Sequence, residues 1–252
     1  MALYRTDGIV LHQFELGEAD KIITYFTKDK GKVRAVAKGV RRPLSKKASS
    51  VQLFTYAEVL IYQGKSLDTI SQSNIHKSFA PLREDLIKMA YGTYILDLIK
   101  EVTVEEDPQP VLFALLLRTL YLLMDGEDPE LVTRIFELRA MTLIGFQPVL
   151  DFCIQCSSPL QGKRFKFHPG SGGLICPNCK TDGRGSTFWI SKGTVKMMRL
   201  LLTGRYNKIF RLNFAKKYRK ELERAMDSFI RYHLDKKLRS LDFLKSVTGM
   251  IT

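Results

Sequence analysis

The first 80 residues place short apolar runs between glycine or polar breaks, a pattern typical of β-strands joined by tight turns. Gly31 closes a Lys-Asp-Lys-Gly turn and Gly64 ends a longer apolar run. Five short strands of this spacing favour a small barrel of the OB type. We expect the strands at 8–14, 22–27, 33–37, 51–62 and 67–75.

From Pro81 onward the apolar positions recur at helical spacing instead. Asp128 with Pro129, and Ser191, stand where helices are expected to begin. The prediction is an α+β protein, with a five-stranded OB-type β-barrel at 1–80 and an α-helical domain at 81–252. We expect helices at 82–104, 111–124, 131–144, 192–202, 212–234 and 238–247.

Four cysteines interrupt the helical pattern inside a glycine-containing insertion at about 150–180. Cys153 and Cys156 form one C-x2-C pair, Cys176 and Cys179 form a second, and nineteen residues separate the two pairs. This spacing lets two tight turns aim four thiolates at one Zn²⁺ ion. Four sulfur ligands leave no open coordination position, so we predict one structural zinc per chain. Two disulfides are one alternative, which suits a cytosolic chain poorly. A redox pair is the other, but it would need one C-x2-C beside a βαβ unit rather than two in a glycine-rich loop.

The charge is unevenly distributed around a formal net value of +14. Residues 1–80 hold 13 basic and 7 acidic residues, residues 81–150 hold 6 and 12, and residues 151–252 hold 21 and 7. A surplus of this size favours a polyanionic partner, which is nucleic acid more often than an anionic membrane surface.

Five cations stand within ten residues between the third and fourth expected strands, with no acid among them. Pro43 and Ser45 are expected to keep this segment extended. A solvated loop is the plain alternative, but the mutual repulsion of the cations favours a loop that contacts phosphates. The cations are Lys38, Arg41, Arg42, Lys46 and Lys47.

Two further basic stretches give weaker evidence for nucleic-acid binding. The cations of the 212–234 helix form either a solvated face, in which Glu221 and Glu223 pair along the helix, or a ridge for nucleic acid. Phe165 and Phe167 alternate with Lys163, Arg164 and Lys166. This stretch is either a surface that binds a nucleic-acid backbone and stacks bases or a hairpin whose inward face holds the two rings, and strand alternation favours the hairpin.

No catalytic signature is present in the sequence. The four histidines are scattered, and neither a P-loop nor a G-x-S-x-G motif occurs. The chain is therefore not expected to be an enzyme. It shows no signal peptide and no apolar run of about 20 residues, so we expect a cytoplasmic protein without membrane association.

Several segments together resemble the RecO family of bacterial recombination mediators, in the family's order and across essentially the whole chain. They include the two cysteine pairs and the basic segment between the third and fourth strands. The others are Gly8-Ile-Val-Leu11, Glu18-Ala-Asp-Lys-Ile-Ile23, Phe136-Glu-Leu-Arg-Ala-Met-Thr-Leu-Ile-Gly-Phe-Gln-Pro148 and Phe167-His-Pro-Gly-Ser-Gly-Gly-Leu-Ile-Cys176.

The resemblance implies a fold and a function. RecO proteins carry an N-terminal OB-fold, a helical body and, in many members, a zinc loop. They bind single- and double-stranded DNA, anneal complementary strands, contact the C-terminal tail of single-strand binding protein, and act with RecR to load RecA. They would act in the cytoplasm at the nucleoid. DNA contacts on the barrel face are carried over to Arg34, Lys38, Arg41, Arg42, Lys46 and Lys47 only.

Two other classes of protein remain as alternatives. The first is a nuclease with metal bound in the acidic segment 81–150, because carboxylates that converge in a cleft can hold catalytic metal ions. The second is a zinc-ribbon interaction module of the transcription or translation machinery.

Overall fold

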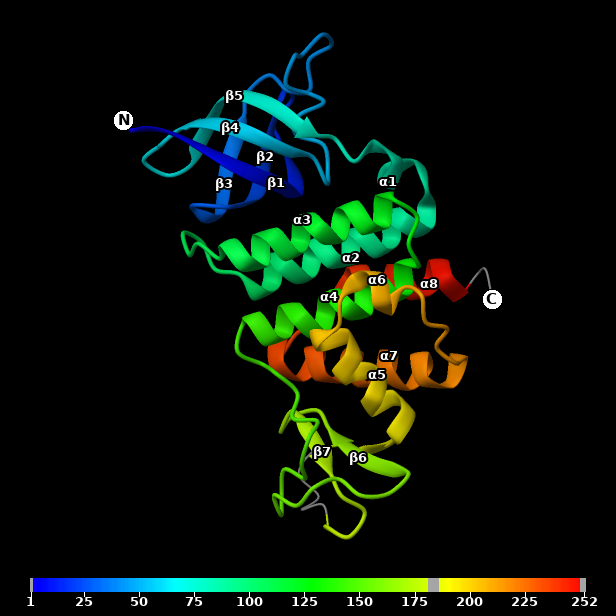
Figure 1. Ribbon diagram of the computed structural model, residues 1–252. Coiled ribbons are helices and arrows are strands. Elements are labelled where there is room, and N and C mark those ends of the chain that lie inside the picture. The colour runs from blue at the N-terminus through cyan, green and yellow to red at the C-terminus, as the bar shows by residue number, and fades with distance from the viewer. Residues whose placement is uncertain (1, 181–185, 250–252) are drawn as a thin grey trace. The chain divides into compact units, whose positions relative to one another are not determined.

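The structure is a computed structural model that describes residues 2–180 and 186–249. The chain divides into two compact units, which are described separately (Figure 1). The first unit comprises residues 1–129 and 238–252, and the second comprises residues 130–237.

The N-terminal strands close into a barrel in the order β1-β2-β3-β5-β4, which confirms the predicted five-stranded OB-type barrel (Figure 1). All neighbours are antiparallel except β3 and β5, which run parallel. The strands are β1 (Leu3–Leu16), β2 (Asp20–Thr27), β3 (Gly31–Ala37), β4 (Tyr56–Tyr62) and β5 (Asp68–Lys77).

The period-two pattern explains which side chains fill the barrel. Val33 and Ala35 on β3 point inward together with Val59 and Ile61 on β4, and all four are buried. β1 pairs with β4 through its first half and with β2 through its second half. A register shift between Val10 and His12 lies where the strand passes from one partner to the other, and such a bulge bends a strand.

The segment between β3 and β4 differs from the expectation. The predicted strand at 51–62 begins only at Tyr56, and the preceding residues form consecutive turns rather than an extended chain. Leu44 and Phe54 have positive φ angles of 69° and 71° within these turns. Val40 and Val51 belong to the barrel core. Their burial explains the apolar pattern that suggested a strand.

The described part of the first unit also contains the helices α1 (Ala80–Glu84), α2 (Leu86–Val102), α3 (Pro110–Met124) and α8 (Arg239–Gly249). The single helix expected at 82–104 is divided, because the Asp85 carboxylate accepts hydrogen bonds from the backbone N–H groups of Ile87 and Lys88 and caps α2. On α3, Phe113 packs against Phe26 of the barrel at a ring-centroid distance of 5.9 Å.

The second unit combines helices with a small antiparallel sheet of order β7-β6-β8. Ser191 caps α5 by accepting from the Thr194 N–H, as predicted. The helix expected at 212–234 begins only at Lys216 and is preceded by the short α6. The elements are α4 (Pro129–Leu143), β6 (Arg164–His168), β7 (Gly173–Ile175), β8 (Phe188–Ser191), α5 (Lys192–Thr203), α6 (Tyr206–Ile209) and α7 (Lys216–Leu234).

Across both units, the helices that the structure describes are too short or too polar to cross a bilayer.

Candidate nucleic-acid interface and candidate metal centre

Residues 38–47, called the basic loop below, are fixed to the barrel at their start. The Gly39 N–H donates to the Asp20 carboxylate at 2.7 Å, and the Arg41 N–H donates to the Ala19 carbonyl at 2.9 Å. Val40 between them is buried in the barrel core. The loop therefore begins as an ordered extension of the barrel, in which Val40 points inward, whereas its cations and Leu44 face solvent.

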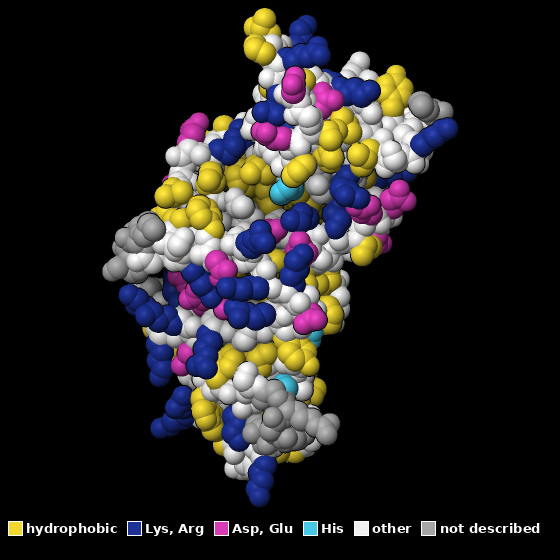
Figure 2. All heavy atoms as spheres, turned by 180° about the vertical axis from the view of Figure 1, so that it is seen from behind, with side chains coloured by type: hydrophobic (Ala, Val, Ile, Leu, Met, Phe, Trp, Pro, Cys, Tyr) yellow, Lys and Arg dark blue, Asp and Glu magenta, His cyan; other side chains and the backbone are white. Residues whose placement is uncertain are grey.

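The five cations of the basic loop differ in their local partners. Arg41 forms an ion pair of 3.1 Å with Glu15, and the Lys47 ammonium donates to the Ile70 carbonyl at 3.3 Å. The side chains of Lys38, Arg42 and Lys46 are exposed and make no ion pair or hydrogen bond to a described residue. These three charges are the ones most available to an external anion. Figure 2 shows further Lys and Arg side chains dispersed over the face that it presents.

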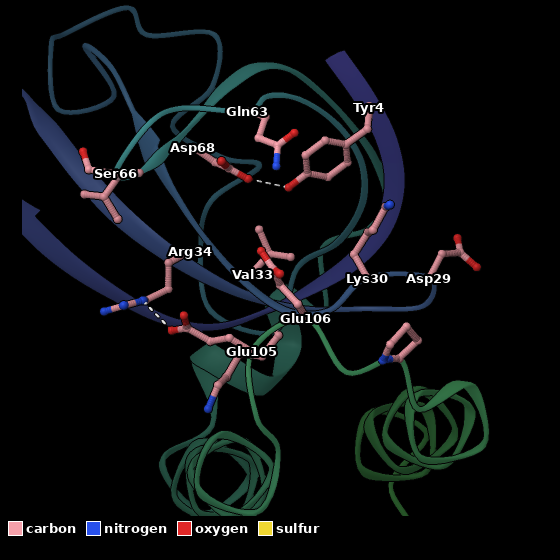
Figure 3. Close-up of a pocket in the computed structure, with 13 residues that line it drawn as sticks. Tyr4, Asp29, Lys30, Val33, Arg34, Gln63, Ser66, Asp68, Glu105 and Glu106 are labelled. Atoms are coloured by element: carbon pink, nitrogen blue, oxygen red, sulfur yellow. Dashed lines mark hydrogen bonds and ion pairs between the residues drawn. The ribbon is translucent and has the colours of Figure 1, made fainter. Parts of the chain in front are cut away.

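Arg34 lies on β3, just before the basic loop, but its contacts differ from those of the loop cations. It lines a cavity of about 400 Å³ between the barrel and the segment that joins α2 to α3 (Figure 3). Its guanidinium forms an ion pair of 2.8 Å with Glu105, and both side chains remain about half exposed. The acidic segment 105–107 thus partly offsets the positive charge of β3.

The same cavity contains polar groups that hold its shape. The Tyr4 hydroxyl donates to the Asp68 carboxylate at 2.6 Å, and burial together with this hydrogen bond raises the pKa of Tyr4 (Figure 3). The Lys32 ammonium donates to the carbonyls of Lys100 and Thr103 at 2.7 and 2.6 Å, which stabilises the C-terminal end of α2. Burial lowers the pKa of Lys32, against the opposite effect of nearby Glu105.

The four cysteines converge on one point of the second unit. Their sulfurs all lie within 4.8 Å of one another. The Cys153 and Cys179 sulfurs are 3.9 Å apart, as are those of Cys156 and Cys176. Disulfide sulfurs would lie about 2.05 Å apart, whereas a tetrahedral zinc ion with Zn–S bonds of about 2.3 Å spaces its ligands about 3.8 Å apart. The donor set and its spacing therefore fit a structural zinc ion.

Local hydrogen bonds prepare this site for a cation. Burial alone would raise the pKa of the Cys153 thiol, but backbone N–H groups of Cys176, Cys156 and Gln155 outweigh it and lower that pKa to about 6. Hydrogen bonds to Cys176 and Cys156 raise the pKa of Cys179 to about 12. The hydrogen bonds thus favour the thiolate at Cys153 and oppose the thiolate at Cys179, and a divalent cation would offset the charge of both.

The backbone around the cysteines explains how two distant pairs meet. β6 and β7 form the hairpin that the glycines predicted, with Gly172 at a φ of 62° beside the ring of Phe229. The Ile154 N–H donates to the Leu174 carbonyl at 2.9 Å, which joins the first cysteine turn to β7. Phe165 and Phe167 are buried, which confirms that they form the inward face of the hairpin.

Two features of the second unit were not predicted. The first is Glu221, expected as a partner for neighbouring lysines or arginines on its own helix. Its carboxylate instead accepts hydrogen bonds from the Ser191 N–H and hydroxyl, both at 2.7 Å, and from the Thr194 hydroxyl at 2.5 Å. The second is Trp189, which is 41% exposed on β8. Only the register of β8 against β6 shows which way its ring points.

The three arginines of α7 make contacts within the second unit. Arg219 forms an ion pair of 3.3 Å with Glu130, and Arg231 forms one of 3.3 Å with Asp227. The Arg224 guanidinium lies 4.3 Å from the ring centroid of Phe188. These contacts favour a solvated helix face for this part of α7.

Comparison with known proteins gives a consistent result along the chain. The family model described as "Recombination protein O N terminal" matches residues 1–79, and the one described as "Recombination protein O C terminal" matches residues 83–242. A protein named "DNA repair protein RecO" from Desulfitobacterium hafniense is 39% identical over 95% of this chain and 88% of its own length. A protein of the same name from Symbiobacterium thermophilum is 37% identical over 98% of both chains.

Proposed function

The chain belongs to the RecO family of DNA repair proteins, and from this premise we propose that it is a non-enzymatic mediator of homologous recombination. It binds single- and double-stranded DNA, anneals complementary strands and, acting with RecR, helps to load RecA onto DNA coated with single-strand binding protein. The observation that carries the proposal is the basic loop, whose free cations stand on a backbone fixed to the barrel.

The physical basis of annealing is the reduction of repulsion between two polyanions. Each Lys or Arg that contacts a phosphate releases condensed counterions, and this gain does not depend on the base sequence. A protein with a net charge of +14 can hold two strands close together while their bases remain free to pair. This mechanism needs no catalytic group and no chemical step.

The proposed DNA contacts fall into two groups. Lys38, Arg42 and Lys46 contact phosphates directly, because no described residue competes for their charges. Arg41, Lys47 and Arg34 contribute when a phosphate replaces their present partners, of which Glu15 and Glu105 are carboxylates. The order of their contributions should follow this difference.

We propose that Cys153, Cys156, Cys176 and Cys179 hold one zinc ion whose role is structural. Such an ion would cross-link the two cysteine turns and stabilise the insertion that carries them. The remaining proposed partners are RecR and the C-terminal tail of single-strand binding protein, in the cytoplasm at the nucleoid.

The proposal is tested by measuring the annealing of two complementary labelled oligonucleotides, bare or coated with single-strand binding protein. The full chain should accelerate annealing and leave both strands intact in the presence of Mg²⁺. A chain with Arg41, Arg42, Lys46 and Lys47 replaced by Glu should bind and anneal more slowly at low salt. Shortened strands would instead favour the nuclease, and tight binding to polymerase or ribosome without faster annealing would favour the interaction module.

A further inference from the structure

We propose that one face of the small sheet in the second unit, formed by Arg164, Lys166 and Trp189 and called the Trp189 face below, binds single-stranded DNA by stacking one base on the indole ring. The inference rests on the proposed function and adds to it a second contact, of a different physical kind from the basic loop. It assigns a role to the one tryptophan of the chain.

The strand register places the three side chains together. Along β6, Phe165 and Phe167 are buried, so Arg164 and Lys166 point to the opposite face. Lys166 pairs with Trp189 across β6 and β8, which brings the indole onto the same face as the two cations. Trp189 is 41% exposed, so part of the residue is open to a ligand.

The two cations already lie close to the ring. The Arg164 guanidinium carbon is 5.8 Å from the ring centroid and the Lys166 ammonium is 5.5 Å from it. Both distances are near the outer limit of about 6 Å for a cation–π contact. The long Arg164 side chain, which makes no hydrogen bond to a described residue, can turn toward a phosphate when a base takes its place on the ring.

The charges around this face favour a polyanion. Residues 152–192 contain six Lys or Arg and a single Asp. Arg164 and Lys166 form no ion pair with a described carboxylate. The Glu221 carboxylate, which reaches β8 from α7, is occupied by the Ser191 and Thr194 hydrogen bonds. Phosphates would therefore meet the positive charges of Arg164 and Lys166 close to the indole.

The support beneath the Trp189 face is rigid. Its opposite side is formed by Phe165, Phe167 and Ile190, all of them buried in the core of the second unit. The Lys166 ammonium also donates to the Cys179 carbonyl at 2.9 Å, which connects the face to the second cysteine turn. An aromatic ring held in place this way stacks on a base without losing much conformational freedom.

Single-stranded nucleic acid fits this arrangement better than a protein partner does. An aromatic platform bordered by cations is the usual means of binding single strands without sequence preference, because every base has a π-face and every nucleotide has a phosphate. A protein-binding patch would extend the apolar surface around the tryptophan, whereas here its neighbours on the sheet are Arg164 and Lys166.

The single tryptophan makes the test direct. Intrinsic fluorescence of the zinc-loaded full chain is followed during titration with an oligo(dT) of about 20 nucleotides, long enough for more than one contact. Because Trp189 is the sole emitter of its kind, quenching reports on its own surroundings. Trp189→Ala should weaken binding of the single strand by about 5- to 150-fold, the range expected when one base–aromatic stack is lost.

Two comparisons separate stacking from general damage to the fold. Trp189→Ala should leave both duplex affinity and the salt slope unchanged, since duplex bases are not free to stack and no phosphate contact is removed. Arg164→Gln should instead lower the salt slope by about 0.7. Phe243→Ala serves as the matched control, because this side chain on α8 is 40% exposed and has no place in the proposal.

The inference would be overturned if Trp189→Ala bound the single strand with an affinity within twofold of that of the unmodified chain. This holds whether or not the fluorescence of the unmodified chain is quenched. An equal loss of duplex binding would overturn it as well, since it would reveal a structural effect. In either case the proposed function would stand if the basic-loop variant still lost DNA binding. If neither Trp189→Ala nor the basic-loop variant lost DNA binding, both this inference and the proposed function would be refuted.

Discussion

The sharpest test of the proposed DNA-binding surface is neutralisation of the three basic-loop cations that have no partner among the described residues. Lys38, Arg42 and Lys46 are exposed, and no described residue offsets their charges. Their replacement by glutamine keeps the side chains polar and removes three positive charges. The loop backbone should be unaffected, because it is held by Val40 and by the hydrogen bond from Gly39 to Asp20.

The size of the effect follows from counterion release. Each phosphate neutralised on a single strand contributes about 0.7 to the slope of log K against log salt. Three lost contacts should therefore lower the slope by about 2. Because the counterion contribution vanishes near 1 M salt, the same loss weakens binding about 100-fold at 0.1 M salt, or about 3 kcal/mol.

The assay is a fluorescence-anisotropy titration of a labelled single strand at four or more salt concentrations. A control variant with glutamine at Lys28, Lys65 and Lys208 carries the same change in net charge, and these side chains are also exposed. It should lose much less affinity and keep most of the slope. Equal behaviour of the two variants would mean that only net charge matters, and an unchanged slope in the loop variant would refute the loop assignment.

The Arg34 ion pair, the cysteine cluster and the Glu221 hydrogen bonds can each be tested by a single substitution. Glu105→Gln should free Arg34 and strengthen single-strand binding, with the salt slope rising by about 0.7 if Arg34 then meets a phosphate; unchanged binding would exclude Arg34 from the interface. Metal analysis should find one zinc per chain, and Cys176→Ser should lose it and make residues 150–180 sensitive to protease, whereas full resistance without metal would contradict the site. Glu221→Gln should destabilise the second unit by about 1–3 kcal/mol, because the charged acceptor for Ser191 is lost. Burial raises the pKa of Glu221, but the hydrogen bonds outweigh this effect and lower that pKa. The stabilisation by Glu221 is therefore complete above the ordinary pKa of 4.5 and is lost as pH falls through the lowered pKa of the folded state. An acid unfolding curve that Glu221→Gln leaves unchanged would refute this.

The barrel and the cysteine cluster were predictable because their signals are local. A period-two pattern within one strand determines which residues face inward, whatever the rest of the chain does. Likewise, the C-x2-C spacing fixes each pair of thiols within a single turn, and only the meeting of the two turns requires tertiary structure. The structure therefore agrees with both predictions, the barrel and the convergence of the four cysteines.

The errors came where one local signal had two structural explanations. Val51 and its apolar neighbours follow strand-like alternation, yet they close one end of the barrel through consecutive turns. The 82–104 segment has helical periodicity throughout, but Asp85 acts as a helix cap that divides it. In both cases a single polar or left-handed residue decides the conformation, and the hydrophobic pattern does not detect it.

The remaining features depend on contacts between residues far apart in sequence. The ion pair of Arg34 with Glu105 brings a segment of the acidic region onto the barrel, which regional charge counts cannot show. Similarly, Trp189 faces solvent because of its register with Lys166, and no pattern within β8 distinguishes an outward indole from a buried one. Sequence reasoning finds such residues only after the pairing of strands is known.

The two proposed contacts are physically compatible with annealing. Phosphate contacts of the basic loop hold either strand or duplex, while stacking on Trp189 selects bases that are not yet paired. One stack is worth about 1–3 kcal/mol, whereas each base-pair step contributes about 1.4 kcal/mol to the duplex. A few paired steps therefore suffice to draw the stacked base away from the indole. A single aromatic platform can thus favour unpaired DNA before annealing and release it afterwards, which a long row of aromatic rings would not do.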